Sequence, residues 1–288
     1  TSNLDATTFA IGLWRATFDS VSRTWRTGQS GAAHSNPPME ADELARPVRG
    51  WDPRELGVGP SIATDDMPTH ADALPRFARR AHDGMLDRIL GKTNRSGNAV
   101  VFVVGDASTG ATRSAYEALR RNYPDALLLA PVGAGDLAAA ASAGLGSPTV
   151  VWLDQAQRYL YGATGDLACG ALLRLLAGRE NLVVVATMWP WYWQEITEPV
   201  EPAGADPRSH ARTLLRMAHR VDVPSRFADP ARDTAFLEKV SGLDPRLSAA
   251  VRLAGDSGEV VQALAGGPAL LARYEHGVGI ESRLARAV

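Results

Sequence analysis

Four short, mostly apolar runs mark the middle of the chain. They read NAVVFVVG, DALLLA, TVVWLD and NLVVVATM, at 98–105, 125–130, 149–154 and 181–188. Runs of this length and composition are typical of parallel strands that are buried on both faces. Because the segments between them have helical spacing, we expect an α/β fold, a three-layer sandwich with a mainly parallel sheet.

The two ends of the chain have a helical pattern instead. Residues 6–26 place Phe9, Trp14, Phe18 and Trp25 along one apolar stripe. We favour a helix that docks on the protein, and a helix that lies on a membrane surface or binds a partner stays open as the less favoured alternative. Beyond Pro207 the strand signals stop, and we expect a small all-helical lid with helices at 208–220, 230–240, 245–254, 258–265 and 268–275.

Glycine, proline, serine and aspartate gather at 27–69, where few apolar positions are periodic. This composition is typical of a linker or an irregular arm. We therefore expect three parts: a helix with an arm at 1–70, an α/β domain at 71–206, and the helical lid at 207–288. The last part ends within a helical pattern, which would fit a truncated chain.

Composition excludes several classes of protein. A net charge of -2 over 288 residues offers no general basic surface for nucleic acid. The single cysteine, Cys169, excludes an internal disulfide and a multi-cysteine zinc site, so a reducing cytoplasm is the expected compartment. We find neither a signal peptide nor an apolar run of the roughly 18 residues that a membrane span needs.

The segment GDASTGAT follows a predicted strand and precedes a predicted helix, which is the context of a phosphate-binding P-loop. Gly105 and Gly110 permit backbone conformations that turn successive amides towards phosphate oxygens, and the hydroxyl of Thr112 would be a ligand of Mg²⁺. We expect cofactor contacts from the whole segment and the residue after it: Gly105, Asp106, Ala107, Ser108, Thr109, Gly110, Ala111, Thr112 and Arg113.

Ala111 stands where the P-loop motif has a lysine. A methyl group supplies neither charge nor hydrogen bond, and losing such a contact costs about 1.5 to 3 kcal/mol, or roughly tenfold to a hundredfold in affinity. Arg113 follows on the helix and is expected to point away from the phosphates. We therefore predict weakened nucleotide binding and severely impaired catalysis.

A second motif carries the acidic group of the site. The run TVVWLD ends in Asp154, where P-loop enzymes place the carboxylate that holds the water shell of Mg²⁺. The next residue is Gln155, at the position where many ATPases have a glutamate that polarises the attacking water. Because an amide cannot accept that proton, hydrolysis would lack its usual base.

The segments VVGDASTGATR, VVWLDQAQRYL and VVVATMWPWYW together resemble the STAND class of P-loop ATPases, particularly large actinobacterial regulators, over about residues 72–280. The resemblance implies ATP or ADP with Mg²⁺, a helical lid, and slow hydrolysis in the intact family form. Site residues implied by the resemblance are Arg79 or Arg80 beside the adenine, Thr187 as a sensor of the γ-phosphate, and Gly266 and Pro268 near the base. A proline that starts a helix is the alternative for Pro268.

Two functions follow from these observations and stay open. The first is an adenine-nucleotide-binding regulatory switch that acts on a protein partner or a homo-oligomer, and the second is a nucleotide-free scaffold. Ala111 and Gln155 fit a natural inactive ATPase, an engineered variant, or one change of each origin. The aromatic segment 189–193 is expected to cover a hydrophobic sheet edge, and arginines are too sparse around it for stacking on nucleic acid.

Overall fold

The structure, a computed structural model, describes residues 45–62, 64, 74–93, 97–142, 150–198, 206, 208–227, 242 and 244–265. The described residues fall in two compact units, one formed between 45 and 60 and between 77 and 227, the other between 61 and 76 and between 242 and 265. The first unit thus extends past both limits expected at 70 and 206. The predicted helices at 6–26, 230–240 and 268–275, and the candidates Gly266 and Pro268, lie outside the described residues.

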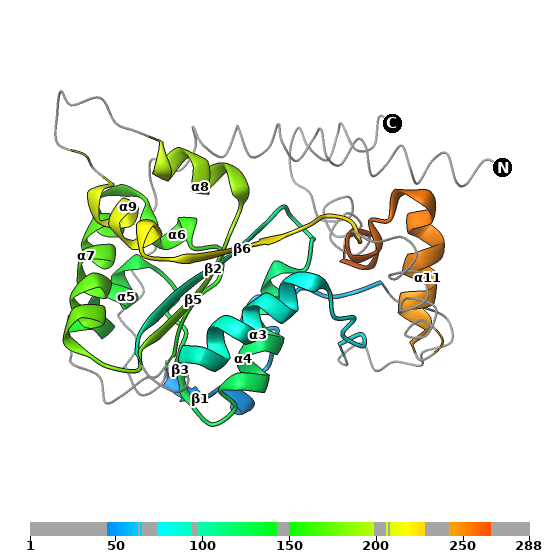
Figure 1. Cartoon of the computed structure of the whole chain (residues 1–288), viewed down its shortest axis with the longest axis horizontal. Helices are drawn as coiled ribbons and strands as arrows, with labels where there is room; N and C mark the ends of the chain where they lie inside the picture. The colour runs from blue at the N-terminus through cyan, green and yellow to red at the C-terminus, as the bar shows by residue number, and fades with distance from the viewer. Residues whose placement is uncertain are drawn as a thin grey trace, which may run out of the picture. The chain divides into compact units, whose positions relative to one another are not determined.

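A six-stranded sheet forms the centre of the first unit, with the order β1-β3-β4-β5-β2-β6 (Figure 1). Only β1 runs antiparallel, against β3, and the other pairs of this sheet are parallel. The predicted mainly parallel sheet is therefore confirmed. The strands are β1 (Ala45–Pro47), β2 (Ala99–Gly105), β3 (Leu127–Leu129), β4 (Val150–Leu153), β5 (Val183–Met188) and β6 (His219–Val223).

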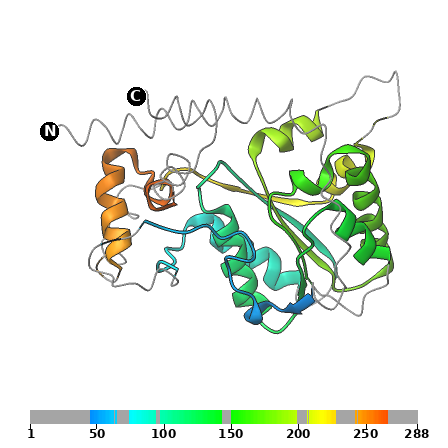
Figure 2. The ribbon, with the colours of Figure 1, turned by 180° about the vertical axis from the view of Figure 1, so that it is seen from behind.

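Helices cover both faces of the sheet, which confirms the predicted three layers (Figures 1 and 2). One face carries α3 (Ala81–Thr93) and α4 (Ala111–Asn122), and the short 3₁₀ turn η1 (Val48–Gly50) contacts α4. The helices on the other side are α5 (Ala134–Ser142), α6 (Gln157–Leu160), α7 (Gly162–Gly178), α8 (Pro190–Thr197) and α9 (Ser209–Arg216). Within the described ranges, every helix is too short or too polar to span a bilayer.

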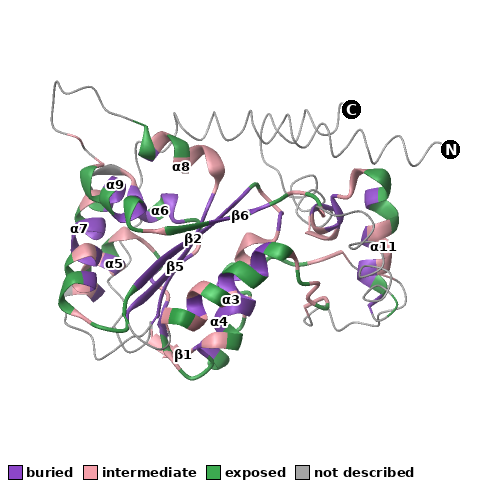
Figure 3. Cartoon of the chain, viewed as in Figure 1, coloured by how far each residue is buried: buried purple, intermediate pink, exposed green. Residues whose placement is uncertain are grey.

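Two inner strands of the sheet, β2 and β5, are buried along their whole length (Figure 3). Their apolar side chains fill both faces, as the continuous apolar runs predicted. Val103 of β2 pairs with Thr187 of β5, and Leu153 of β4 pairs with Ala186. Because parallel strands end at the same edge of a sheet, this register brings the loops that follow β2, β4 and β5 together.

Two strands lie where the sequence predicted none. β1 belongs to the expected arm, and β6 contradicts the expectation that the region beyond residue 207 is all-helical. The helix predicted at 208–220 ends at Arg216, and Val101 to Gly105 of β2 pair with the five residues from His219 to Val223. The β6 sequence HRVDV alternates polar and apolar residues on an outer strand, a weak signal beside the continuous runs.

The second unit is held together by segments far apart in the sequence. Asp244 caps the N-terminus of helix α11 and also accepts a hydrogen bond from the Arg76 amide, at 2.8 Å. The Ile62 amide donates to the Leu264 carbonyl, at 2.9 Å. Its described helical elements are α11 (Pro245–Ala254), at the position predicted from the sequence, the 3₁₀ turn η2 (Gly255–Ser257), and residues 260–265.

Candidate functional site

The turn from β2 into α4 begins at Gly105, where the side chain of any other residue would clash with its neighbours. A Cβ atom on Gly105 would lie 2.6 Å from the Thr109 hydroxyl oxygen and 3.0 Å from the Val223 Cβ. The Thr109 hydroxyl donates to the Asp106 carbonyl, at 2.8 Å, and so closes the loop on itself. The loop is therefore packed tightly between its own backbone and the end of β6.

The remaining loop amides are available to a ligand. Ser108 and Gly110 have positive φ angles of 60° and 86°, and Gly110 is the residue before α4. A buried or half-buried backbone N–H normally has a partner, and the first amides of a helix attract anions. Within the described part of the chain, no protein acceptor is bonded by the amides of five residues, Ala107, Ser108, Gly110, Ala111 and Thr112.

Asp154, directly after β4, is the centre of a hydrogen-bond network. Its Oδ1 accepts from the hydroxyl of Thr112, at 2.9 Å, and from the hydroxyl of Thr187, at 2.7 Å. The Gln155 amide donates to the Thr187 oxygen, at 2.8 Å. The structure therefore brings together four candidates: Thr112 of the predicted phosphate loop, Asp154 and Gln155 at the end of one predicted strand, and Thr187 at the end of another.

Burial raises the pKa of the Asp154 carboxyl above its ordinary value, and the hydrogen bonds from Thr187 and Thr112 oppose this shift. The net shift is upward, so poor solvation of the charged form outweighs those bonds. A cation beside Asp154 would stabilise the carboxylate. Mg²⁺ typically uses one or two carboxylates together with waters and phosphates, which a lone carboxylate next to the Thr112 hydroxyl can satisfy.

A part of the expected arm also reaches this carboxylate. Gly57 has a φ of 88°, and a Cβ atom there would lie only 2.3 Å from Asp154 Oδ2. The Trp152 indole donates to the Leu56 carbonyl, at 3.1 Å, and both Leu56 and Val58 are buried. The sequence pattern did not predict this contact, although two apolar residues flanking a glycine are a detectable sign of packing.

The two residues expected to impair hydrolysis lie at this same edge of the sheet. Ala111 is the first residue of α4, and Gln155 follows Asp154 with a φ of 52°. The Gln155 side chain is exposed, and the turn behind it is closed by the Ala156 amide, which donates to the Thr187 carbonyl at 2.7 Å. Gln155 thus stands next to the acidic group with its amide side chain directed to solvent.

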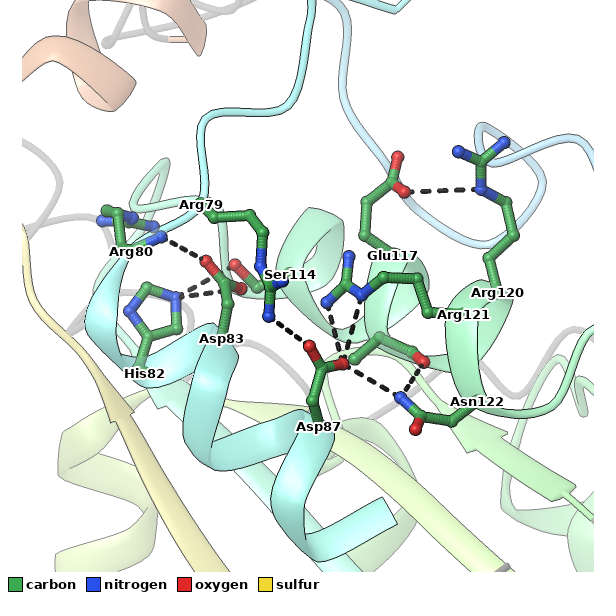
Figure 4. Close-up of polar contacts among 11 residues, drawn as sticks. Arg79, Arg80, His82, Asp83, Asp87, Ser114, Glu117, Arg120, Arg121 and Asn122 are labelled. Carbon is green, nitrogen blue, oxygen red and sulfur yellow. Dashed lines mark hydrogen bonds and ion pairs between the residues drawn. The ribbon is translucent and has the colours of Figure 1, made fainter. Parts of the chain in front are cut away.

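Of the two arginines expected beside an adenine, only Arg80 reaches the loop. Arg79 forms an ion pair with Asp87 on α3 (Figure 4). The Arg80 guanidinium donates to the carbonyls of Thr109, at 2.6 Å, and Pro224, at 2.9 Å. Arg80 therefore contacts the loop through its backbone.

Arg113 is directed along α4. Its guanidinium lies 2.7 Å from the Glu117 carboxylate and 5.7 Å from the centre of the Phe77 ring. A pair four residues apart on one helix is the usual arrangement for opposite charges. The position agrees with the expected direction away from the loop.

A buried polar cluster lies at the start of α3 (Figure 4). His82 Nε2 is 3.0 Å from the Ser114 hydroxyl on α4, and Asp83 Oδ2 accepts from the Arg80 amide, at 2.7 Å. Burial, and then the neighbouring Arg80 charge, lower the pKa of His82. A neutral imidazole therefore supports the helix that begins at the loop.

Over the described residues, no group of three or more histidines, cysteines and acids is arranged to hold a metal. No family model and no curated protein sequence matches the chain. Among solved structures, Hsp104 of S. cerevisiae in its complex with casein is similar at 14% identity and a TM-score of 0.47, covering 85% of this chain and 41% of Hsp104. The chain thus spans less than half of that protein.

DnaA from Aquifex aeolicus, bound to AMPPCP, is similar at 15% identity and a TM-score of 0.39. This match covers 78% of the present chain and 70% of DnaA. Since both TM-scores are below 0.5, the chemistry of the site has to be judged from its own residues.

Proposed function

We propose that this chain binds ATP or ADP with Mg²⁺ and acts as a regulatory switch of the STAND type whose hydrolysis is impaired. The observation that carries the proposal is the group of loop amides that bond no acceptor among the described residues, directly beside the Thr112–Asp154 pair. Backbone donors at a helix N-terminus are suited to phosphate, and a hydroxyl next to a carboxylate is suited to Mg²⁺.

The phosphates would be bound mainly by the backbone. The amides from Ala107 to Thr112, except that of Thr109, are available, and the α4 N-terminus adds its positive dipole end. Mg²⁺ would supply the charge that neutralises the phosphates. Thr112 would contact the ion, and Asp154 would hold its water shell.

Hydrolysis is expected to be very slow because two contributions are missing. Ala111 provides no cation to the transferred phosphate, and Gln155 cannot take a proton from water. A nucleotide would therefore persist on the protein, which suits a switch that signals by occupancy. Binding would bias a lid, and the lid would act on a protein partner or a further copy of the chain. The roles of Gly266 and Pro268 beside the base belong to this proposal.

The test is calorimetric titration of the chain with ATP, ADP and GTP, each with and without Mg²⁺. We expect saturable binding that prefers adenine nucleotides and tightens with Mg²⁺. Gly110→Pro should abolish binding, because proline can neither adopt the φ of 86° at this position nor donate the amide hydrogen. Circular dichroism of the variant checks that the fold is retained, and normal nucleotide binding by a folded Gly110→Pro protein would refute the assignment.

A scaffold without nucleotide is the second candidate, and Ala111 and Gln155 are the specific observations that favour it. In that case the same fold would serve protein interaction alone. The titration separates the two functions: the absence of binding up to millimolar ATP and ADP would support the scaffold, while micromolar binding would exclude it.

A further inference from the structure

We infer that Arg80 is a positioning residue of the phosphate loop, which brings to the loop backbone the positive charge that Ala111 cannot provide. The inference rests on the proposed nucleotide binding. It assigns to Arg80 a role on the phosphate side of the site, in place of the adenine contact that the sequence resemblance implied.

The contacts of the guanidinium carry this assignment. Nη2 donates to the Thr109 carbonyl at 2.6 Å, and Nη1 donates to the Pro224 carbonyl at 2.9 Å. Both acceptors are backbone atoms, so Arg80 fixes the path of the chain at two places. An arginine is suited to this because its planar group presents several donors in a rigid arrangement.

The Thr109 carbonyl belongs to the same peptide group as the Gly110 amide. A charged donor on the oxygen of a peptide group polarises that group and makes its N–H a stronger donor, since linked hydrogen bonds strengthen each other. The Gly110 N–H bonds to no acceptor in the described part of the chain. Arg80 therefore strengthens, through one peptide group, a donor that the proposed function assigns to phosphate.

Contacts at its backbone and at its guanidinium fix the position of Arg80. Its own amide donates to Asp83 Oδ2 at 2.7 Å, and the Asp83 side chain is fully buried in the first turn of α3. The Phe227 ring centre lies 5.6 Å from the guanidinium carbon. The arginine is thus held at its backbone by α3 and at its head by the loop and the segment after β6.

The hydrogen bond from Arg80 to the Pro224 carbonyl links the loop to a segment outside it. Pro224 directly follows β6, and the chain runs from there past Phe227. A change in the Thr109 peptide on phosphate binding would alter the geometry of a guanidinium that also holds Pro224. Arg80 therefore connects occupancy of the loop to the segment that leaves the α/β unit.

The experiment compares Arg80→Gln with the matched control Arg79→Gln in the full chain. The neighbouring Arg79 is exposed and is also paired, but with Asp87 on α3, away from the loop. Binding of ATP, tripolyphosphate and adenosine is measured by displacement of a fluorescent ATP analogue. Arg80→Gln should weaken ATP and tripolyphosphate equally, by roughly tenfold to a hundredfold, and leave adenosine unchanged. Arg79→Gln should leave tripolyphosphate binding unchanged, because the Arg79 guanidinium pairs with Asp87 and not with the loop.

The variant Arg80→Lys tests positioning against a general loss of structure. An ammonium group keeps the charge but lacks the rigid double contact, so it should restore part of the tripolyphosphate affinity. The assignment is overturned if Arg80→Gln weakens adenosine as much as ATP, if Arg80→Lys gives no rescue, or if both glutamine variants bind normally. Absence of nucleotide binding by the unmodified chain would instead refute the proposed function itself.

Discussion

The two halves of the candidate site are built in opposite ways. On the phosphate loop, five backbone amides between Ala107 and Thr112 have no protein acceptor in the described chain. At the end of β4, by contrast, Oδ1 of the Asp154 carboxylate already accepts from two hydroxyls, and Gly57 lies close to Oδ2. One half offers backbone donors, and in the other half one carboxylate oxygen is already hydrogen-bonded.

This difference predicts two kinds of response to a ligand. An anion can join the loop without breaking a protein hydrogen bond, so phosphate binding needs little rearrangement there. A bound Mg²⁺ would instead join a Thr112–Asp154 pair that is already hydrogen-bonded. Under the proposed function we therefore expect the loop to set the basal affinity for nucleotide, and the carboxylate to set how strongly Mg²⁺ adds to it.

The largest effect is expected from Gly57→Ala, which disturbs the half of the site around Asp154. The added methyl would sit 2.3 Å from Asp154 Oδ2 on a backbone with φ of 88°. The strain of a left-handed residue, together with weakened hydrogen bonds at Asp154, should lower the free energy of unfolding by about 2 to 5 kcal/mol. Urea denaturation measures this change.

Gly59→Ala is the matched control for that experiment, because a Cβ atom at Gly59 meets nothing within 4 Å. Its stability should stay close to that of the unmodified chain. Equal destabilisation by both substitutions would show that the segment is merely intolerant of alanine, and would remove the special role given to the contact with Asp154.

A smaller effect is expected on the open half from Ala111→Lys. A lysine at the start of α4 would add the missing cation, and ATP affinity should rise by roughly tenfold to a hundredfold. The control Ala111→Gln adds length without charge and should gain far less. Combined with Gln155→Glu, the lysine variant should also release phosphate from ATP; a double variant that binds ATP tightly without any turnover would contradict the roles assigned to these positions.

The two halves should also change the free energy of unfolding in opposite directions as pH changes. On the loop side, the pKa of His82 is lowered in the folded protein, so the unfolded chain takes up the proton first as pH falls below the ordinary value of about 6.5. The neutral His82 therefore contributes to the free energy of unfolding above about pH 6.5, and this contribution is lost as pH falls from there through the lowered pKa. The slope can reach at most about 1.4 kcal/mol per pH unit. Thermal unfolding across pH, compared with His82→Asn, measures it, and an unchanged slope in the variant would exclude His82 as the source.

The smallest effect on stability is expected from Asp154→Asn. Because the pKa of Asp154 is raised in the folded protein, the unfolded chain loses this proton first as pH rises. Ionisation of Asp154 therefore lowers the free energy of unfolding as pH rises through the raised pKa. Replacing it with an amide should leave the unliganded protein as stable as before or more stable by about 1 kcal/mol. Calorimetry of the variant should show ATP binding that no longer responds to Mg²⁺, and a retained response would place the ion elsewhere.

The parts of the site that could be predicted from the sequence are local. Gly105 to Thr112 form one continuous segment from the end of β2 into the start of α4, and Asp154 directly follows the four buried residues of β4, so spacing alone locates both. The parts that could not be predicted depend on distant pairs. The Gly57–Asp154 contact and the Arg80 bonds to Thr109 and Pro224 join residues that no short-range pattern links.

The missed strands have the same physical origin. β1 has three residues, and its pairing with β3 from Ala45 to Pro47 depends on a partner that lies beyond the whole of β2 and α4. β6, the last strand in the sheet order, has polar residues at three of its five positions, His219, Arg220 and Asp222, and all three are exposed. An edge strand needs little apolar surface, so its sequence carries little sign of a sheet.

The position of β2 in the sheet has a consequence for how the protein is made. β2 leaves the ribosome before both of its neighbours, β5 and β6, and it pairs with neither β3 nor β4, which are synthesised in between. At about 5 to 20 residues per second, the apolar strand AVVFVVG waits for several seconds without its partners. The strand that carries the phosphate loop is therefore the segment of the nascent chain most in need of shielding from aggregation.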